Sequence, residues 1–141
     1  MAAEKRTEVF NAPIEKIYKT IIKYEDYPDF VDGVSSIDVS NQTEQGAEVQ
    51  FNLNIIKTFS YRVKLTHERP NRVSWTFIDG DIFKKNNGGW TLKDLGDGTT
   101  EVTYELDLGF KVLVPSMISK KLSKSSLPSM MKAMEKRAQN A

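Results

Sequence analysis

A two-residue alternation of apolar and polar side chains runs through residues 34–110, and it constrains the fold of this chain more than any other feature. In the clearest segment, Val102, Tyr104, Leu106 and Leu108 alternate with charged and hydroxyl residues. Successive side chains of a strand point to opposite faces, so this pattern is typical of an antiparallel sheet with one buried and one solvated face. Its recurrence along the region predicts about six consecutive antiparallel strands.

Short turn-forming stretches separate the alternating segments. Hairpin connections are predicted at stretches rich in Gly, Asn, Asp or Pro, namely 41–46, 69–71, 79–81 and 96–98. We expect a β-bulge at Asn86–Gly89, just before Trp90, because paired glycines permit sharp bending of a strand. No repeat or low-complexity linker divides the chain, so residues 1–141 are predicted to form a single domain.

The segment before the sheet region predicts a strand followed by a helix. Residues 5–11 alternate weakly and are expected to form the strand, and Pro13 is well placed to start the helix. Apolar residues then follow the helical i, i+3, i+4, i+7, i+8 spacing at Ile14, Ile17, Tyr18, Ile21 and Ile22. The helix should end before Tyr27–Pro28, because the residue before a proline avoids helical torsions. A further short helical turn is expected at Asp29–Val31.

Residues 115–138 have helical periodicity with a change of face. On a helical wheel, the apolar residues fall into two groups on nearly opposite sides: Val114, Met117, Ile118 and Leu122, then Leu127, Met130, Met131, Met134 and Ala138. Pro128 lies at the changeover, where it removes a backbone donor. We therefore expect two helical segments meeting near 125–127, or one helix kinked sharply near Pro128. The predicted fold class is α+β, with the sheet covered by this terminal helix.

The terminal segment is also basic. From Lys111 onward, seven Lys and Arg residues oppose Glu135 alone, although the whole chain has a formal net charge of only +1. Cations near the C-terminus of a helix interact favourably with the helix dipole, which is sufficient to explain Lys136 and Arg137. The alternative is a surface for an anionic partner. A peripheral contact with an anionic membrane would use residues of this segment, Lys120, Lys121, Lys124 and Lys132.

Composition excludes several classes of function. The chain has no cysteine, so disulfides and thiolate chemistry are excluded. With a single histidine, the sequence does not favour a zinc site, and we expect neither a metal nor a cofactor. No apolar run is long enough to span a bilayer, and the N-terminus has no signal-peptide core. A cytoplasmic location is the expectation, with a peripheral position at a membrane surface left open.

No catalytic constellation is recognisable in the sequence. The single histidine, His67, has inward parity but ends a strand beside Glu68 and Arg69, a position more typical of a hydrogen-bonded structural residue than of a base. The chain has no G-x-S-x-G nucleophile elbow. Acidic residues fall on the solvated face or in loops, and Asp79 is the nearest inward candidate. No catalytic residue is assigned, and a non-enzymatic role is favoured.

The apolar face of the predicted sheet is rich in aromatic residues. Packing against a helix is sufficient to explain such a stripe, so a filled core is one interpretation. A strongly curved sheet also encloses space that side chains do not fill, and methionines suit adaptable apolar surfaces. The candidate ligand-binding residues are Phe51, Leu53, Phe59, Tyr61, Val63, Trp75, Phe77, Trp90, Tyr104, Leu106, Phe110, Met117, Met130 and Met134. Among these, Tyr61, Tyr104 and Trp75 offer hydrogen bonds to a ligand carbonyl.

The order of the elements and several segments resemble a known family. Residues 10–34, 73–92 and 99–110, which include the YPxF stretch from Tyr27 and the GWxL stretch from Gly89, are similar to the START-like polyketide cyclase and coenzyme Q-binding family with the helix-grip fold. The resemblance implies a curved sheet of about seven antiparallel strands wrapped on a C-terminal helix, with an apolar tunnel between them. It also implies lipid, quinone or polyketide ligands, and some members are described as ribosome-associated toxins.

The sequence therefore favours one function and leaves two alternatives. The favoured function is non-catalytic binding or carriage of a hydrophobic small molecule, such as a quinone, an acyl lipid or a polyketide-like compound, between the sheet and the terminal helix. The first alternative is an enzyme of the polyketide cyclase or dehydratase type, which needs an inward acid–base pair. The second is a module that associates with RNA or the ribosome through the basic terminal helix, with a steep dependence on salt.

Overall fold

The structure is a computed structural model, and it describes residues 2–55, 57–111, 114–118 and 127–141. Within these residues, two α-helices, a short 3₁₀ helix and seven strands have bounds that the structure defines. In chain order they are β1 (Ala2–Phe10), α1 (Ile14–Ile22), η1 (Tyr24–Asp29), β2 (Val34–Ser40), β3 (Gly46–Ile55), β4 (Lys57–Glu68), β5 (Arg72–Gly80), β6 (Phe83–Asp94), β7 (Thr100–Phe110) and α3 (Leu127–Gln139).

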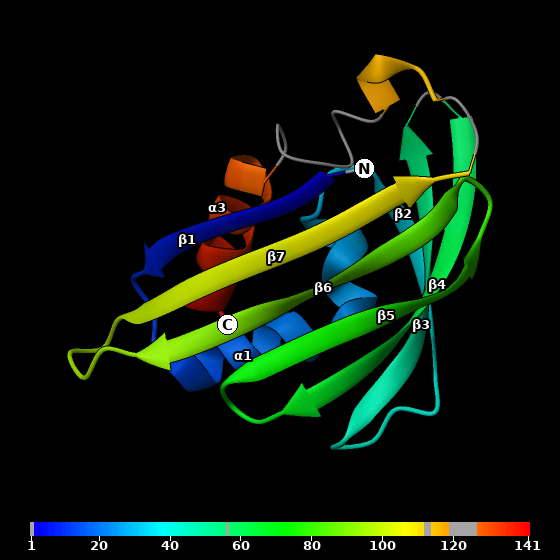
Figure 1. Cartoon of the computed structure of the whole chain (residues 1–141). Coiled ribbons are helices and arrows are strands. Elements are labelled where there is room, and N and C mark those ends of the chain that lie inside the picture. The colour runs from blue at the N-terminus through cyan, green and yellow to red at the C-terminus, as the bar shows by residue number, and fades with distance from the viewer. Residues whose placement is uncertain (1, 56, 112–113, 119–126) are drawn as a thin grey trace.

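The seven strands form one antiparallel sheet. Their order is β1-β7-β6-β5-β4-β3-β2, so each strand from β2 to β7 pairs with its neighbours in sequence and β1 closes onto β7. Figure 1 shows the sheet curving around α1 and α3, which both lie on its inner side. The predicted α+β helix-grip architecture, with a curved sheet, an N-terminal helix and a C-terminal helix, is confirmed.

The first helix agrees with the prediction, whereas the short helical turn after it does not. Helix α1 starts after Pro13 as expected and buries Ile17 and Ile21. The short helical turn predicted at Asp29–Val31 is wrong, because η1 occupies Tyr24–Asp29 and contains Pro28. The tyrosines of η1 are buried, and the Tyr27 hydroxyl donates a hydrogen bond of 2.5 Å to the carbonyl of Ile21. This bond satisfies one of the free carbonyls at the end of α1 and fixes η1 against it.

The hairpins are confirmed, whereas the bulge in β6 lies elsewhere than predicted. Residues 86–94 pair regularly with β7, and the register shift falls between Phe83 and Lys85. The shift turns the side chain of Phe83 to the inner face, where it is only 2% exposed. Gly88 serves a different purpose, because a Cβ at this position would lie 2.7 Å from the indole of Trp75.

A second register shift lies between Arg62 and Val63, where β4 pairs with β5. Val63 pairs with Phe77, and Arg62 pairs with Asp79, so Ile78 is the extra residue. Both Ile78 and Asp79 are exposed. Asp79, the nearest inward carboxylate by sequence parity, therefore points to solvent, because the bulge reverses the alternation.

The C-terminal helix α3 begins at Leu127, with Pro128 in its first turn. A proline is tolerated there because the first backbone N–H groups of a helix have no partner within it. Residues 116–118 are also helical, but the predicted junction at 125–127 falls mainly outside the described residues. The main-chain N–H of Asn11 donates to Glu135 at 2.8 Å, which ties α3 to the end of β1.

Arg137 also holds α3 in place. Its guanidinium lies 3.4 Å from the carboxylate of Asp26 and 3.5 Å from that of Asp29, both in η1. It also lies over the ring of Phe30, with 5.3 Å between the guanidinium carbon and the ring centroid. One of the basic residues that suggested an anionic partner is therefore used within the chain.

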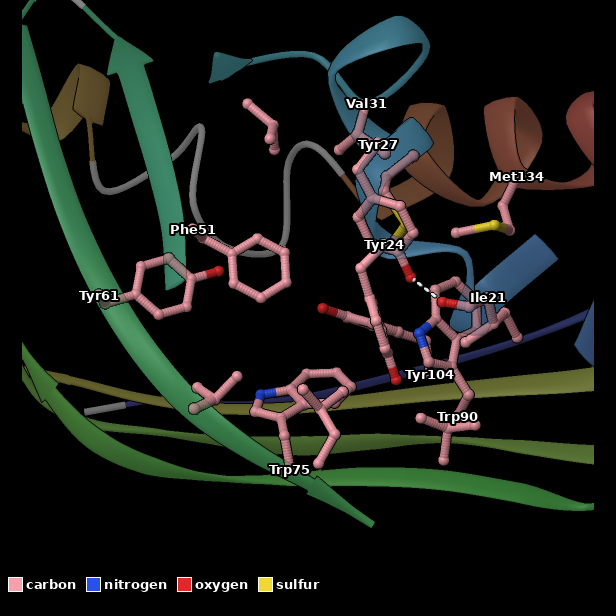
Figure 2. A pocket seen from close by; sticks show the side chains of 15 residues that line it. Ile21, Tyr24, Tyr27, Val31, Phe51, Tyr61, Trp75, Trp90, Tyr104 and Met134 are labelled. Atoms are coloured by element: carbon pink, nitrogen blue, oxygen red, sulfur yellow. Dashed lines mark hydrogen bonds between the residues drawn. The ribbon is translucent and has the colours of Figure 1, made fainter. Parts of the chain in front are cut away.

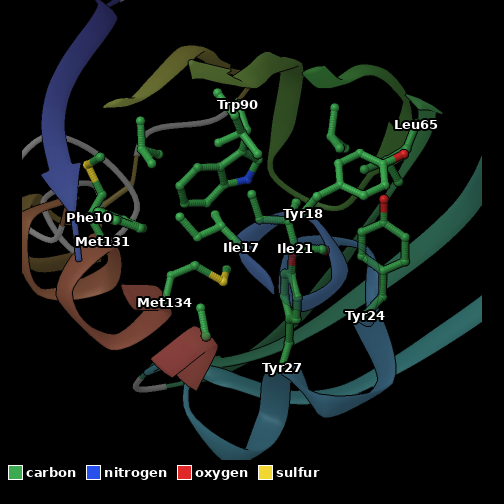
Figure 3. Close-up of a cluster of buried hydrophobic side chains, with 14 of the residues drawn as sticks. Phe10, Ile17, Tyr18, Ile21, Tyr24, Tyr27, Leu65, Trp90, Met131 and Met134 are labelled. Atoms are coloured by element: carbon green, nitrogen blue, oxygen red, sulfur yellow. The ribbon is translucent and has the colours of Figure 1, made fainter. Parts of the chain in front are cut away.

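Buried apolar residues form one main cluster and two smaller ones. The main cluster lies between the sheet, α1 and α3, and includes Phe10, Ile17, Trp90 and Met131 (Figure 3). The second contains Leu53, Phe59 and Ile118, and the third contains Phe83, Leu106 and Leu108.

Candidate ligand-binding cavity

A cavity of about 120 Å³ lies inside the main apolar cluster (Figure 2). It is enclosed by strands β2 to β7 on the sheet side and by α1, η1 and α3 on the helix side, with Val31 from the segment after η1. The residues that line it are Ile21, Tyr24, Tyr27, Val31, Val34, Phe51, Tyr61, Val63, Leu65, Val73, Trp75, Trp90, Tyr104, Met130 and Met134.

The structure divides the candidate ligand-binding residues into two groups. Those that line the cavity are Phe51, Tyr61, Val63, Trp75, Trp90, Tyr104, Met130 and Met134. The others lie elsewhere: Leu53 and Phe59 belong to the second cluster, Leu106 to the third, and Phe77 and Phe110 pack against the third. Met117 is 60% exposed. The sequence pattern therefore identified the inner face of the sheet but not the part of it that encloses space.

Several lining residues were not among the sequence candidates. Leu65 and Val73 have the inward parity of their strands, and Ile21 lies on the apolar face of α1, so these positions carried a signal. Tyr24 and Tyr27 carried no periodic signal, because they lie in a 3₁₀ turn without helical or strand periodicity, although Tyr27 begins the YPxF stretch.

Aromatic rings stand on two sides of the cavity. Phe51 and Tyr61 stack nearly in parallel, with 5.1 Å between centroids and 9° between planes. Tyr104 contacts Trp75 and Trp90, with centroid distances of 5.6 Å and 4.7 Å. Figure 2 shows the Phe51–Tyr61 pair at one side of the cavity, Trp90 at the other and Trp75 below.

A buried amide connects two of these rings. Asn86 is only 4% exposed, and its Oδ1 accepts a hydrogen bond of 3.2 Å from Nε1 of Trp75. Its side chain also hydrogen-bonds the phenol of Tyr61, which opposes the rise in the pKa of Tyr61 caused by burial. Asn86 therefore fixes the polar edges of both rings at the wall of the cavity.

The single histidine lies behind the cavity wall. Nε2 of His67 and the hydroxyl of Tyr24 are 2.7 Å apart, and the histidine is only 7% exposed. Burial lowers the pKa of His67, against the opposite effect of hydrogen bonds to the backbone of Thr43 and Glu44. Backbone carbonyls accept from the other ring nitrogen, so Nε2 of the neutral ring is the acceptor and Tyr24 is the donor.

Electrostatically, the cavity is apolar with neutral phenols. Burial raises the pKa of Tyr24, Tyr27, Tyr61 and Tyr104, so all four hydroxyls stay protonated at neutral pH. Among the described residues, no carboxylate, histidine or basic side chain lines the cavity. The arrangement suits the burial of an apolar molecule and hydrogen bonding to an oxygen atom, without a strong acid or base in contact with it.

The described residues offer neither a metal site nor a membrane-spanning helix. No group of three or more His, Asp or Glu side chains is positioned to hold a metal ion. None of the described helices combines the length and the apolar character needed to cross a membrane.

The sequence and the fold match an established family. The sequence model of the family described as polyketide cyclase/dehydrase and lipid transport matches residues 10–135, which is most of the chain. The chain therefore belongs to this START-like family, as its sequence resemblance predicted. A comparison with curated protein sequences gave no match.

Solved structures with the same fold span nearly the whole chain. A START superfamily protein from Mycobacterium smegmatis aligns with a TM-score of 0.83 at 21% identity, covering 98% of this chain and 97% of that one. The Zhui aromatase/cyclase from Streptomyces sp. R1128 gives 0.85 at 10% identity, with coverage of 99% and 94%. A STAR-related lipid transfer protein from Xanthomonas axonopodis gives 0.82 at 12% identity, with coverage of 97% and 85%. At these identities the likeness establishes the shared fold.

Proposed function

We propose that this protein binds and carries a hydrophobic small molecule in the cavity between the sheet and the helices, without transforming it. The observation that carries the proposal is the composition of the cavity wall, where aliphatic, aromatic and methionine side chains surround the space. Burial of apolar ligand surface is worth about 25 cal/mol per Å², so few polar contacts are needed. The lipid-transport part of the family description supports the same function.

The size of the cavity narrows the class of ligand. Its volume of about 120 Å³ is close to the ~150 Å³ of an engineered cavity that binds benzene, and smaller than the roughly 300–1,000 Å³ of typical ligand pockets. It accommodates a single ring, such as the head of a quinone or one ring of a polyketide-like compound. A larger ligand or an acyl chain requires the lining to yield, and Met130 and Met134 are its most adaptable side chains.

A peripheral contact with an anionic membrane is a finer part of the proposal. Of the residues predicted for this contact, Lys132 is exposed on α3, whereas Lys120, Lys121 and Lys124 lie outside the described residues. Each cation near an anionic surface contributes at most about 1 kcal/mol. Co-sedimentation with vesicles tests this contact, since equal binding to neutral and anionic vesicles, or no binding, would remove it.

An enzyme of the cyclase or dehydratase type is the second candidate, and one observation favours it. Tyr24 lines the cavity and its hydroxyl donates to His67, so a residue of the cavity wall shares a hydrogen bond with a histidine. Among the solved structures with this fold, one is named an aromatase/cyclase and two are named di-domain ARO/CYC proteins. Conversion of a bound aromatic precursor by the native protein, lost in the His67→Gln variant, would favour this candidate over carriage.

Native mass spectrometry of the protein purified from its own host, combined with extraction of bound lipids, tests the carriage proposal directly. The expected result is a hydrophobic molecule bound at one copy per chain and recovered chemically unchanged. Protein that carries no molecule and takes up no small aromatic compound in titrations would contradict the proposal.

A cavity-filling variant ties the binding to this cavity. Val73 and Val49 are both fully buried valines of the main cluster, but only Val73 borders the cavity. In Val73→Phe the added ring enters existing space, so the protein should stay folded and lose binding of benzene or toluene. In the matched control Val49→Phe the ring has no space, so overpacking should cost about 1–3 kcal/mol of folding free energy. Unchanged toluene binding by Val73→Phe would place the site elsewhere.

A further inference from the structure

The hydrogen-bond network at the cavity wall determines which phenol protons are free. An indole N–H is only a donor, so the contact between Trp75 and Asn86 assigns Oδ1 of Asn86 to the indole. The amide nitrogen of Asn86 then faces Tyr61 and donates to its phenol oxygen. Because the oxygen of Tyr61 is occupied as an acceptor, its own proton remains available as a donor.

Tyr104 provides a second free donor. It lines the same cavity, and its ring is held by contacts with Trp75 and Trp90. Within the described part of the chain, its hydroxyl has no hydrogen-bond partner. The two phenols also interact electrostatically, because a charge on Tyr61 would raise the pKa of Tyr104. A hydroxyl without a partner is free to donate, so a ligand atom that accepts its proton gains affinity.

The other two tyrosines of the cavity lack a free proton. The Tyr27 hydroxyl donates to the carbonyl of Ile21, and the Tyr24 hydroxyl donates to His67. The cavity is therefore asymmetric. Its free donors are on Tyr61 and Tyr104, whereas the oxygens of Tyr24 and Tyr27 remain as acceptors.

We propose that the hydroxyls of Tyr61 and Tyr104 together hold one carbonyl oxygen of the ligand, so that the cavity selects a cyclic or aromatic ketone over a hydrocarbon of the same shape. This inference rests on the proposed function, since it concerns which ligand the cavity takes. The ring of the ligand lies among Phe51, Trp75 and the methionines, which provide the apolar contact. Asn86 is a positioning residue, because it acts through Tyr61.

Acetophenone and α-methylstyrene are suitable probes, because they differ only in that a C=CH₂ group replaces C=O. Their affinities for the whole chain are measured by titration calorimetry with the native protein, Tyr61→Phe, Tyr104→Phe and the control Tyr18→Phe. Tyr18 is a buried phenol of the same cluster that does not line the cavity. Because α-methylstyrene is the more hydrophobic probe, the informative quantity is the change in the affinity ratio that each substitution causes.

The expected result is a loss of about 5-fold in acetophenone affinity for each of Tyr61→Phe and Tyr104→Phe, as one neutral hydrogen bond is removed. The affinity for α-methylstyrene should change by less than about 2-fold in both, and Tyr18→Phe should leave the ratio unchanged. The infrared carbonyl stretch of bound acetophenone should also rise towards its value in apolar solvent in the Tyr61→Phe/Tyr104→Phe double variant. Loss of packing alone would not shift this band.

The outcomes separate the two proposals. Binding of neither probe to the native protein would overturn the proposed function, and this inference with it. Binding of both probes with an affinity ratio that neither Tyr61→Phe nor Tyr104→Phe changes would overturn the two-donor site alone. A ratio that changes in only one variant would overturn the shared role of the two hydroxyls.

Discussion

The cavity and the third apolar cluster lie on the same inner face of one sheet, but the described aromatic rings are arranged differently in the two regions. In the third cluster, the ring of Phe83 packs against three other aromatic rings. Its centroid lies 5.0 Å from that of Tyr61, 6.4 Å from that of Phe77 and 5.4 Å from that of Phe110. Rings from β4, β5 and β7 thereby converge on one residue of β6.

Around the cavity, the aromatic rings pack within two separate groups. Phe51 stacks on Tyr61, and Tyr104 packs with Trp75 and Trp90, so neither group needs the space between them. Tyr61 belongs to both regions, since it also meets Phe83. The comparison indicates that the direction of the rings, rather than their number, decides whether a curved sheet encloses a void.

The largest expected effect comes from removing a ring at the closed end. Phe83→Ala should cost about 3–5 kcal/mol of folding free energy, because it deletes a ring packed on all sides. The matched change Phe51→Ala should cost less than about 2 kcal/mol, because part of the Phe51 ring already faces empty space. Equilibrium denaturation in urea measures both values. Equal costs would mean that the cavity wall is as tightly packed as the third cluster.

Two neighbouring methionines of α3 provide a finer comparison of the same kind. Met131 is fully buried and does not line the cavity, whereas Met130 is partly buried and does. Met131→Ala should cost about 2–4 kcal/mol, and Met130→Ala about 1 kcal/mol. Met130→Ala should in addition enlarge the cavity and tighten the binding of a larger ring compound such as naphthalene. Thermal unfolding and naphthalene titration check the two parts, and weaker naphthalene binding by Met130→Ala would contradict the assignment.

The order of strands and helices was predictable because alternation and turn chemistry are local signals, whereas the helix-grip arrangement was implied by the family resemblance. The strand alternation, the hairpins and the helix from Ile14 each follow from neighbouring residues. The position of Phe83 was not predictable by parity, because the register shift between Phe83 and Lys85 reverses the face of the strand. The face of the sheet on which Asp79 lies was predicted wrongly for the same reason. A β-bulge shifts the register by one residue, and the alternation pattern does not reveal this shift.

The candidate site was predictable in outline but not in extent. Inward parity selected Tyr61, Trp75 and Tyr104 correctly as residues of the inner face, and it selected Phe59 equally, although Phe59 lies outside the cavity. Whether a ring borders a void depends on the curvature of the sheet and on ring orientation, which are properties of the assembled structure. Tyr24 and Tyr27 reach the cavity from the 3₁₀ helix η1, whose sequence has no periodic pattern of apolar residues.

The smallest expected effect concerns the contact between Tyr24 at the cavity wall and His67 behind it. Burial lowers the pKa of His67 below its ordinary value of 6.5, so the unfolded chain binds a proton that the folded chain does not. The contribution of His67 to the free energy of unfolding is then fully present above pH 6.5, and it is lost as the pH falls from 6.5 through the lowered pKa.

The variant His67→Gln keeps a hydrogen-bonding side chain but does not titrate, and it removes the only histidine of the chain. Urea denaturation at closely spaced pH values between about 5 and 7 should therefore give a slope for the native protein that is absent from His67→Gln. Identical slopes in the two proteins would mean that the contact between Tyr24 and His67 is as open to protonation as an exposed histidine, and that the wall of the cavity is less closed at this point than at Phe83.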